Sequence, residues 1–404
     1  MYKVAVIGAG IGGSYLSYRL AQQGLETITF DFRVPHEKLC GGGVTHKAVE
    51  RFPVLSALPC PRKEVWKADI ISPNNRVVTI DLAKPLAVFN RRDLDYSLLL
   101  KAQESGAEFR KERVRSFSRK GHHWIIVTEK GEYGAEKLVG ADGALSGTRR
   151  RLGLPLKPDG YFLALQCSLS VKEDAVTFKF FPHIQGYLWA FPRADVLAVG
   201  IVSKEWTAPG RRGMKEKLLD FVDRHYPGNA DAVSLRGAYI PFFAEADYQD
   251  QTICSENWAL IGDAARFVDP ISGEGMYYAL YSAEILADCI KEDKILEYAG
   301  LCGEHFGGNL LKASRGFPYI YQTEFIDAMT VLAGKSRPIR QIISDMMVGD
   351  LNYLNWKGRF KRNSLRIMTE FLLKSDYATK KELIASLSSL RGFHFRDVPR
   401  PRTS

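Results

Sequence analysis

The 404-residue sequence contains no closely spaced pair of cysteines. Its six cysteines lack any C-x-x-C spacing, which argues against a zinc site and against a disulfide framework. No run approaches the roughly eighteen consecutive apolar residues of a membrane-spanning helix. The first residues run directly into an apolar strand pattern instead of a signal peptide, so we expect a cytoplasmic protein without a metal site.

Net charge is almost absent from the first 330 residues. The formal charge is +10, but residues 331–404 hold fifteen Lys and Arg against six Asp and Glu, which leaves about +1 for the rest. A basic terminal region can meet an anionic membrane, a diphosphate substrate or an electron-donor protein, and it can equally be an ordinary solvated surface. No zinc-finger spacing or RNA-binding motif accompanies it, so we expect no nucleic-acid partner.

The apolar pattern divides the chain into three kinds of segment. Residues 3–7, 12–23 and 27–30 predict a strand, a helix and a second strand, the βαβ start of a parallel sheet. Between about residues 160 and 205 apolar residues alternate with period two, which predicts antiparallel strands. Almost everything after residue 292 has a helical pattern. The sequence therefore predicts an α/β protein, α+β overall, with a Rossmann-like domain, an interleaved antiparallel sheet and a helical C-terminus.

The turn after the first strand carries a dinucleotide fingerprint. Gly8, Gly10 and Gly13 form G-x-G-x-x-G between a strand and a helix. Gly8 permits a tight turn, Gly10 leaves room for a pyrophosphate, and Gly13 lets the helix approach the strand closely. Gly12 opens the helix, whose free N–H groups can face the phosphates. Asp31, eighteen residues after Gly13, is placed to accept hydrogen bonds from ribose hydroxyls.

Two later motifs favour a flavin over a nicotinamide. Residues 139–143 (V-G-A-D-G) and 260–265 (L-I-G-D-A-A) each place an aspartate beside a glycine at a strand end, where the carboxylate can bind a ribityl hydroxyl. The second motif leads through G-E-G at 273–275 into a helix whose dipole can point at the flavin ring. The segments resemble the DG and GD motifs of p-hydroxybenzoate-hydroxylase-type flavoproteins. The resemblance implies that FAD is held in part by Arg91, Asp142, Gly143, Gly262, Asp263, Gly273, Gly275 and Met276.

Two further segments resemble the geranylgeranyl reductases. Residues 187–192 (Y-L-W-A-F-P) and Gly200 are similar to that family's Y-x-W-x-F-P … G-x-G substrate motif, with Val202 in place of the last glycine. Residues 38–43 (K-L-C-G-G-G) are similar to its cysteine-glycine loop. On one strand face the three aromatic rings can line an apolar substrate, or they can be sheet core. The resemblance implies substrate contacts from Tyr187, Trp189, Phe191, Pro192 and Gly200, and flavin contacts from Cys40, Gly41 and Gly42.

The thiol of Cys40 is the candidate catalytic group. It can donate a proton or polarise an alkene, or it can be a small spacer in the loop. His46 and Glu274 are further proton candidates. The resemblance implies hydride transfer from N5 of reduced FAD to an isolated C=C bond of a geranylgeranyl-type chain. An isoprenoid diphosphate and a prenyl lipid both remain open as substrate, and NADPH and ferredoxin as electron donor.

Other flavin chemistries share the same dinucleotide motifs. An aromatic monooxygenase needs neither the Y-x-W-x-F-P strand nor the cysteine-glycine loop, and the W-x-W-x-I-P motif of halogenases is only loosely similar to residues 187–192. A non-catalytic protein that holds a flavin is the third alternative. We divide the chain into an FAD-binding domain (1–60, 85–158 and 252–292), an antiparallel-sheet substrate domain (61–84 and 159–251) and a helical basic region (293–404).

Overall fold

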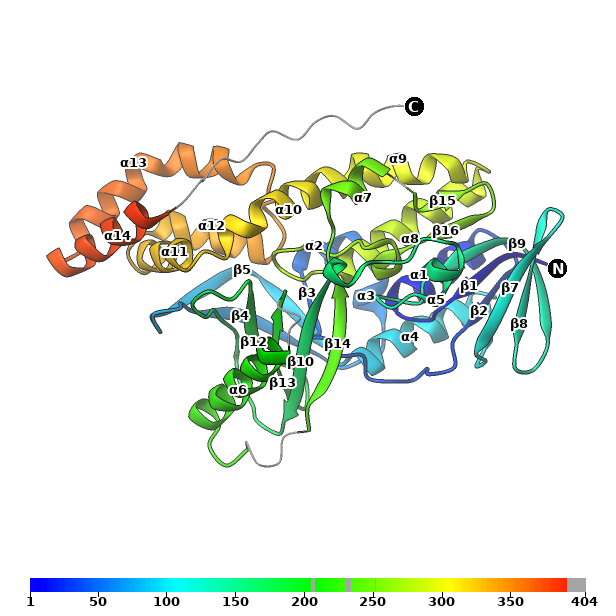
Figure 1. Cartoon of the computed structure of the whole chain (residues 1–404), viewed down its shortest axis with the longest axis horizontal. Helices are drawn as coiled ribbons and strands as arrows, with labels where there is room; N and C mark the ends of the chain where they lie inside the picture. The colour runs from blue at the N-terminus through cyan, green and yellow to red at the C-terminus, as the bar shows by residue number, and fades with distance from the viewer. Residues whose placement is uncertain (205–207, 230–233, 251, 391–404) are drawn as a thin grey trace.

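The fold contains two eight-stranded sheets, and a row of C-terminal helices lies along one side of them (Figure 1). The computed structural model describes residues 1–204, 208–229, 234–250 and 252–390. The first sheet follows the order β15 (Cys254–Ser255), β16 (Trp258–Leu260), β9 (Glu132–Gly140), β1 (Tyr2–Ile7), β2 (Thr27–Phe30) and β6 (Glu108–Arg110). A hairpin extends it beyond β9, formed by β7 (Val114–Lys120) and β8 (His123–Thr128).

The first sheet confirms the predicted βαβ unit. Strand β1 pairs in parallel with both β2 and β9, and its central residues are fully buried. Helix α1 (Ile11–Gln22) follows the glycine turn and packs between α4 (Arg91–Glu104) and α8 (Met276–Lys291). Gly13 lets the first turn of α1 lie close to the end of β1, because a Cβ atom at this position would lie 1.9 Å from the carbonyl oxygen of Gly8.

The second sheet is mixed, and its strands between residues 160 and 205 pair antiparallel with one another, as their period-two pattern predicts. Its order is β14 (Arg236–Pro241), β10 (Tyr161–Leu169), β13 (Leu197–Ser203), β12 (Gly186–Pro192), β11 (Ala175–Lys179), β4 (Arg62–Ile71), β5 (Val77–Phe89) and β3 (Gly43–Val44). Strand β11 pairs in parallel with β4, and the other pairs are antiparallel. About a hundred residues of chain connect β4 to β11, so no tight turn forces them to run in opposite directions.

The C-terminal region is mostly helical up to residue 390, as the sequence predicts, and residues 391–404 of the predicted helical region lie outside the described residues. It contains α9 (Tyr298–Cys302), α10 (Gly308–Ile320), α11 (Thr323–Lys335), α12 (Arg337–Met347), α13 (Trp356–Lys374) and α14 (Tyr377–Ser389). Helices α11 and α12 contact β5, and their buried Val331 and Ile339 share a core with Val78 and Ile80 of that strand. These helices therefore cover the second sheet instead of forming a separate appendage (Figure 1).

One long helix and several short ones complete the described fold. Helix α6 (Ala208–His225) packs against β13 on the other side of the second sheet. The remaining short helices are α2 (His46–Arg51), α3 (Val54–Ala57), α5 (Gly147–Arg151) and α7 (Glu245–Asp250). Within the described residues, every helix is too short or too polar to cross a bilayer.

Candidate active site

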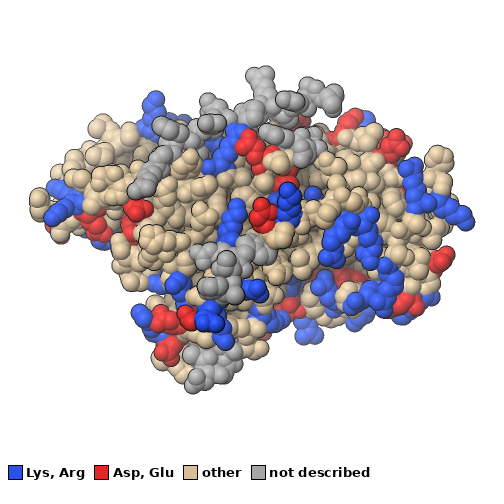
Figure 2. All heavy atoms as spheres, in the orientation of Figure 1, with Lys and Arg blue, Asp and Glu red and all other residues tan. Residues whose placement is uncertain are grey.

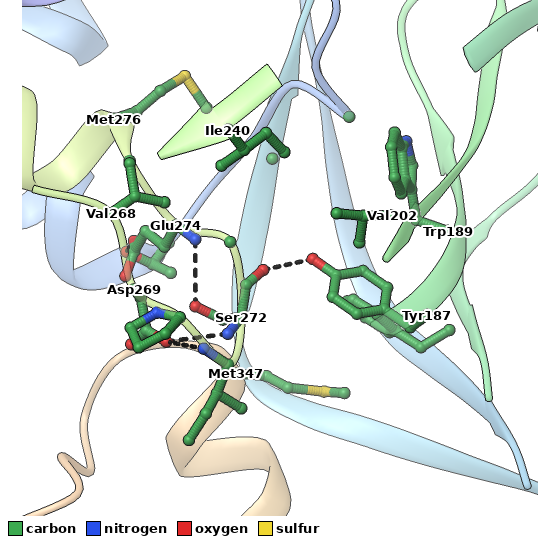
Figure 3. Close-up of a pocket in the computed structure, with 18 of the residues that line it drawn as sticks. Tyr187, Trp189, Val202, Ile240, Val268, Asp269, Ser272, Glu274, Met276 and Met347 are labelled. Atoms are coloured by element: carbon green, nitrogen blue, oxygen red, sulfur yellow. Dashed lines mark hydrogen bonds between the residues drawn. The ribbon is translucent and has the colours of Figure 1, made fainter. Parts of the chain in front are cut away.

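A cavity of about 500 Å³ lies where the two sheets and the C-terminal helices meet (Figure 3). Its walls come from the glycine turn before α1, the Cys40 loop, the segment before α8, the inner face of the second sheet, and α11 to α13. The predicted site residues that line it are Gly10, Gly12, Cys40, Gly41, Gly42, Arg91, Gly143, Tyr187, Trp189, Phe191, Gly262, Asp263, Gly273, Gly275 and Met276. Those outside its lining are Gly8, Gly13, Asp31, Asp142, Pro192 and Gly200.

The glycine turn fits a dinucleotide phosphate. Helix α1 begins with no capping side chain and no acidic residue in its first turn, so its N–H groups are available to an anion. A Cβ atom at Gly10 would meet nothing nearer than 3.9 Å, which leaves space beside the backbone. The buried Asp31 accepts hydrogen bonds from the backbone N–H of Ala9 at 3.0 Å and of Arg33 at 2.9 Å. Asp31 thereby fixes the turn, and its carboxylate keeps further acceptor capacity for ribose hydroxyls.

A buried ion pair supports the same wall. Arg91 donates two hydrogen bonds to Oδ1 of Asp95, from Nε at 3.1 Å and Nη2 at 3.0 Å, and one to Oδ2 at 2.8 Å. Burial is the largest single influence and alone would lower the pKa of Arg91. The charges and hydrogen bonds of Asp95 and Cys40 together outweigh it, so the pKa lies above its ordinary value. Arg91 is therefore a fixed cation at the cavity surface.

The two strand-end aspartates have different surroundings. Asp142 accepts hydrogen bonds from the hydroxyl of Ser146 at 2.5 Å and from the backbone N–H of Thr148 at 2.9 Å. These contacts anchor the start of α5, which accounts for the position of Asp142 outside the cavity lining. Asp263 does line the cavity and forms an ion pair with Lys38 at 2.8 Å, which joins it to the Cys40 loop.

Arg193, which the sequence motifs did not single out, holds the Cys40 loop in place. Its side chain donates to the carbonyl oxygens of Cys40 at 2.5 Å and Gly41 at 3.3 Å, and it pairs with Glu37 at 2.5 Å. The Sγ atom of Cys40 accepts a hydrogen bond from the backbone N–H of Gly42 at 3.4 Å. The sequence carries no local signal for this role of Arg193, because its partners lie about 150 residues earlier in the chain.

The three aromatic residues of β12 all line the cavity. Phe191 packs on the glycine loop, where Cβ atoms at Gly41 and Gly43 would lie 2.9 and 2.6 Å from its ring. Trp189 lies over Gly200, where a Cβ atom would be 2.2 Å from the indole. Gly200 thus contributes to the wall by making room for Trp189.

The hydroxyl of Tyr187 connects β12 to the segment before α8. It donates a hydrogen bond to the backbone carbonyl oxygen of Ser272 at 2.5 Å (Figure 3). Burial raises the pKa of this phenol above its ordinary value, so the hydroxyl stays protonated and keeps its donor. The aromatic wall and the loop that leads into α8 are therefore held together across the cavity.

A polar cluster lies in the cavity beside that loop. Glu274 accepts a hydrogen bond from the hydroxyl of Thr45 at 2.8 Å. Burial raises the pKa of the Glu274 carboxyl to about 7, against the smaller opposing effects of Lys47 and Thr45. Burial also raises the pKa of the neighbouring Asp269 and lowers that of Lys47. A carboxyl that titrates near neutrality can exchange a proton with a bound molecule.

The far wall of the cavity belongs to the C-terminal helices. It is built from apolar side chains of α11, α12 and α13, namely Ile326, Met329, Ala333, Ile342, Ile343, Met346, Met347, Trp356 and Phe360. On the facing sheet it meets Ile70, Val78, Leu86, Phe178 and Phe180. Methionine adapts to irregular apolar shapes, so this wall suits a long flexible hydrocarbon. The sequence had no motif for any of these helical residues.

The profile of the FAD binding domain matches residues 1–292. The chain belongs to the FAD-binding domain family. Digeranylgeranylglycerophospholipid reductase 1 of Methanococcoides burtonii is 27% identical to it, over 77% of this chain and 82% of that protein. FAD as cofactor, the expected fold, and the resemblance of this FAD-dependent oxidoreductase to geranylgeranyl reductases are thereby confirmed.

Two solved structures illustrate the proteins that share this fold. The geranylgeranyl bacteriochlorophyll reductase-like protein of Thermoplasma acidophilum has a TM-score of 0.76 and 21% identity, covering 90% of this chain and 98% of its own. The halogenase PltM in complex with phloroglucinol and FAD has a TM-score of 0.66 and 16% identity, covering 96% and 95%. At these identities the likeness bears on the fold alone.

Proposed function

We propose that this FAD-dependent oxidoreductase saturates isolated C=C bonds of a prenyl chain. The observation that carries the proposal is one continuous cavity whose walls change from the flavin-binding glycine turn to an apolar surface of aromatic and methionine side chains. The name of the Methanococcoides relative, a reductase of a geranylgeranyl lipid, supports the same substrate class. Burial of each CH₂ group contributes about 0.8 kcal/mol, so a chain in this cavity gains affinity along its length.

The proposed reaction needs a hydride and a proton. Bound FAD in its reduced form supplies the hydride. An isolated alkene is a poor hydride acceptor, so a protein group must deliver a proton to the adjacent carbon before or during the transfer. Cys40 and Glu274 both line the cavity and are the candidates for this role. The aromatic side chains of β12 hold the alkene in position and exclude water.

An aromatic monooxygenase or a halogenase is the alternative within the same fold. Those reactions act on compact rings, as the phloroglucinol bound to PltM illustrates. A ring needs no apolar wall that extends to Ile343, Met347 and Phe360 on the C-terminal helices. The extent of this wall favours the prenyl substrate.

Anaerobic reoxidation tests the proposed function. The purified protein is reduced without oxygen, a geranylgeranyl substrate is added, and the visible absorption of the oxidised flavin is followed. We expect the flavin to reoxidise while the product gains two hydrogens for each double bond reduced. A flavin that stays reduced until oxygen is admitted would instead support the monooxygenase.

We also propose that α13 and α14 contact an anionic membrane. Leu365 and Leu373 of α13 are each 81% exposed, whereas Ile367 and Phe371 of the same helix are buried, and Tyr377 at the start of α14 is 83% exposed. Uncharged surface lies between charged side chains at this end of the molecule (Figure 2). Exposed apolar residues among basic ones are typical of interfacial helices. Replacing Leu365 and Leu373 by serine should reduce co-flotation with vesicles that contain anionic lipid, and unchanged flotation would contradict the proposal.

A further inference from the structure

A second cavity, of about 310 Å³, lies between α12 and α13. Three arginines line it, Arg337 from the start of α12 and Arg359 and Arg366 from α13. The other lining residues are Pro338, Gln341, Ile342 and Asn363, so its lining is cationic or neutral and includes no carboxylate. We call this cavity the arginine groove.

Two carboxylates outside the lining hold the arginines in place. Asp345, which is buried, pairs with Arg359 and accepts a hydrogen bond from the Gln341 amide at 2.7 Å. Glu370 pairs with Arg366 at 2.9 Å and accepts a hydrogen bond from the backbone N–H of Arg337 at 2.8 Å. Three guanidinium charges against two carboxylates leave one net positive charge.

The groove retains hydrogen-bond donors after these contacts. Each guanidinium has five N–H groups in a rigid fork, and the pairings with Asp345 and Glu370 use only some of them. Among the described residues, the side chain of Arg337 has no hydrogen-bond or ion-pair partner. Helix α12 begins here without an acidic residue in its first turn, so its dipole adds to the positive potential.

The arginine groove adjoins the apolar cavity. Ile342 lines both, and the next residues of α12, Ile343, Met346 and Met347, line the apolar cavity. Helix α12 therefore presents the cationic Arg337 to the groove at its first turn and apolar side chains to the cavity toward its end. A molecule with an anionic head and a hydrocarbon tail has the matching distribution of charge.

We propose that the arginine groove binds the phosphate or diphosphate group of the prenyl substrate while the prenyl chain occupies the apolar cavity. This inference rests on the proposed prenyl reduction and adds the charged end of the substrate to it. Arginine forks match the oxygens of phosphate in bidentate geometry, which gives both affinity and orientation. The phosphate can belong to a free prenyl diphosphate or to a phospholipid headgroup.

A double variant removes two arginines and keeps the fold. Arg337→Ala with Arg366→Ala takes away the two most exposed guanidinium groups, whereas Arg359 stays because its loss would leave the buried Asp345 without its cation. The matched control is Arg224→Ala, an exposed arginine on α6 that pairs with Asp220 far from both cavities. Bound FAD and the melting temperature check that each variant is folded, and the single substitution Arg337→Gln is the milder backup.

Titration calorimetry on the oxidised, FAD-loaded proteins measures the contribution of the anionic head group to binding separately from that of the hydrocarbon chain. Geranylgeranyl diphosphate and geranylgeraniol share the hydrocarbon, and only the first carries phosphate. We expect the dissociation constant of the diphosphate to rise at least about tenfold in the double variant, with that of geranylgeraniol unchanged. The Arg224→Ala control should bind both ligands as the unaltered protein does.

The other outcomes are distinguishable. Unchanged diphosphate affinity in the double variant would overturn the arginine groove and leave the proposed function intact. Failure of the unaltered protein to bind either ligand would contradict both. A parallel titration with a geranylgeranyl phosphoglyceride in vesicles identifies the source of the phosphate. If the double variant loses affinity for the free diphosphate alone, the substrate is a soluble diphosphate. If it loses affinity for the lipid alone, the groove binds a phospholipid headgroup.

Discussion

The cavity wall around the glycine turn (the glycine-turn wall) and the wall formed by α11 to α13 (the C-terminal wall) enclose the same cavity, but only the first is marked by sequence motifs. The first depends on a backbone that turns sharply at Gly8 (φ +107°) and on helix starts free of acidic residues. Few residue types satisfy those demands, so they appear as motifs. The second wall requires only apolar volume, which Met329, Ile343 and Phe360 supply without any fixed order. A hydrocarbon site can therefore be extensive and still have no sequence signature.

The largest effect should come from a change in the glycine-turn wall. Gly13→Ala would place a Cβ atom 1.9 Å from the carbonyl oxygen of Gly8, inside a turn that cannot widen without moving α1. We expect the purified protein to lose bound FAD and to melt at a lower temperature, measured from the flavin-to-protein absorbance ratio and by calorimetry. Gly131→Ala, where an added Cβ atom meets nothing within 4 Å, is the control. Normal FAD content in Gly13→Ala would show that the turn is more tolerant than its packing implies.

A substitution in the C-terminal wall should weaken the binding of the substrate and leave the binding of FAD unchanged. Met347→Trp would fill part of the apolar cavity beside the loop of Ser272 and Glu274 (Figure 3). We expect KM for a geranylgeranyl substrate to rise by about tenfold or more, because each CH₂ group excluded from the cavity loses about 0.8 kcal/mol of binding. A geranyl substrate, with half as many carbon atoms, should lose less, and the FAD content should not change.

Leu296→Trp is the control for the filled cavity. Leu296 is also in the C-terminal third of the chain, but it is 63% exposed and lies away from the cavity lining. Steady-state kinetics with both chain lengths should match the unaltered protein. If KM rises equally for the short and the long substrate in Met347→Trp, the C-terminal wall does not contact the distal part of the prenyl chain.

The sequence was sufficient for the parts of the site that are fixed by local backbone geometry. It located the glycine turn and the aromatic strand, and the structure places Gly10, Cys40 and Tyr187 around one cavity. It gave no indication of Arg193, whose partners in the Cys40 loop lie about 150 residues earlier. Contacts of that kind depend on how distant segments pack, and a single sequence carries no local pattern for them.

A motif also leaves the direction of a side chain open. Asp142 occupies the position that the DG motif predicts, yet its carboxylate anchors Ser146 and Thr148 at the start of α5. Gly200 lies in the substrate motif, yet it acts through Trp189 instead of lining the cavity. The sequence also did not predict that β11 pairs in parallel with β4. Alternating apolar residues indicate which face of a strand is buried, but not the direction of the neighbouring strand.

The aromatic strand should show an intermediate effect. Gly200→Ala would place a Cβ atom 2.2 Å from the Trp189 indole and force the ring to move within the cavity wall. Such overpacking costs about 1–3 kcal/mol of stability, and we expect the turnover of a prenyl substrate to fall by about tenfold while FAD is retained. Gly237→Ala on β14, where the nearest atom would be 3.7 Å away, should behave as the unaltered protein. Loss of FAD from Gly200→Ala would mean that the packing of the aromatic strand and the binding of FAD are energetically coupled.

The smallest expected effect on stability concerns Glu274, which lies between the glycine-turn wall and the C-terminal wall. Its neighbour Lys47 donates a backbone hydrogen bond to Val348 after α12, and Tyr353 donates to Asp269 at 3.3 Å. Burial raises the pKa of the Glu274 carboxyl from the ordinary 4.5 to about 7, so the folded protein binds this proton more tightly than the unfolded chain. The stabilisation is complete below pH 4.5 and is lost as the pH rises through about 7.

Glu274→Gln keeps the shape of the side chain and removes its titration. We expect the melting temperature of this variant to fall less steeply between about pH 5 and pH 8 than that of the unaltered protein. Glu216→Gln on α6, a substitution at an exposed position, should keep the original pH dependence. If the carboxyl is also the proton donor, prenyl reduction by the unaltered protein should decline above about pH 7, where the group is ionised, and the variant should lose that decline together with most of its activity. An active variant with a flat pH profile would assign Glu274 to the structure of the junction and leave Cys40 as the proton donor to test.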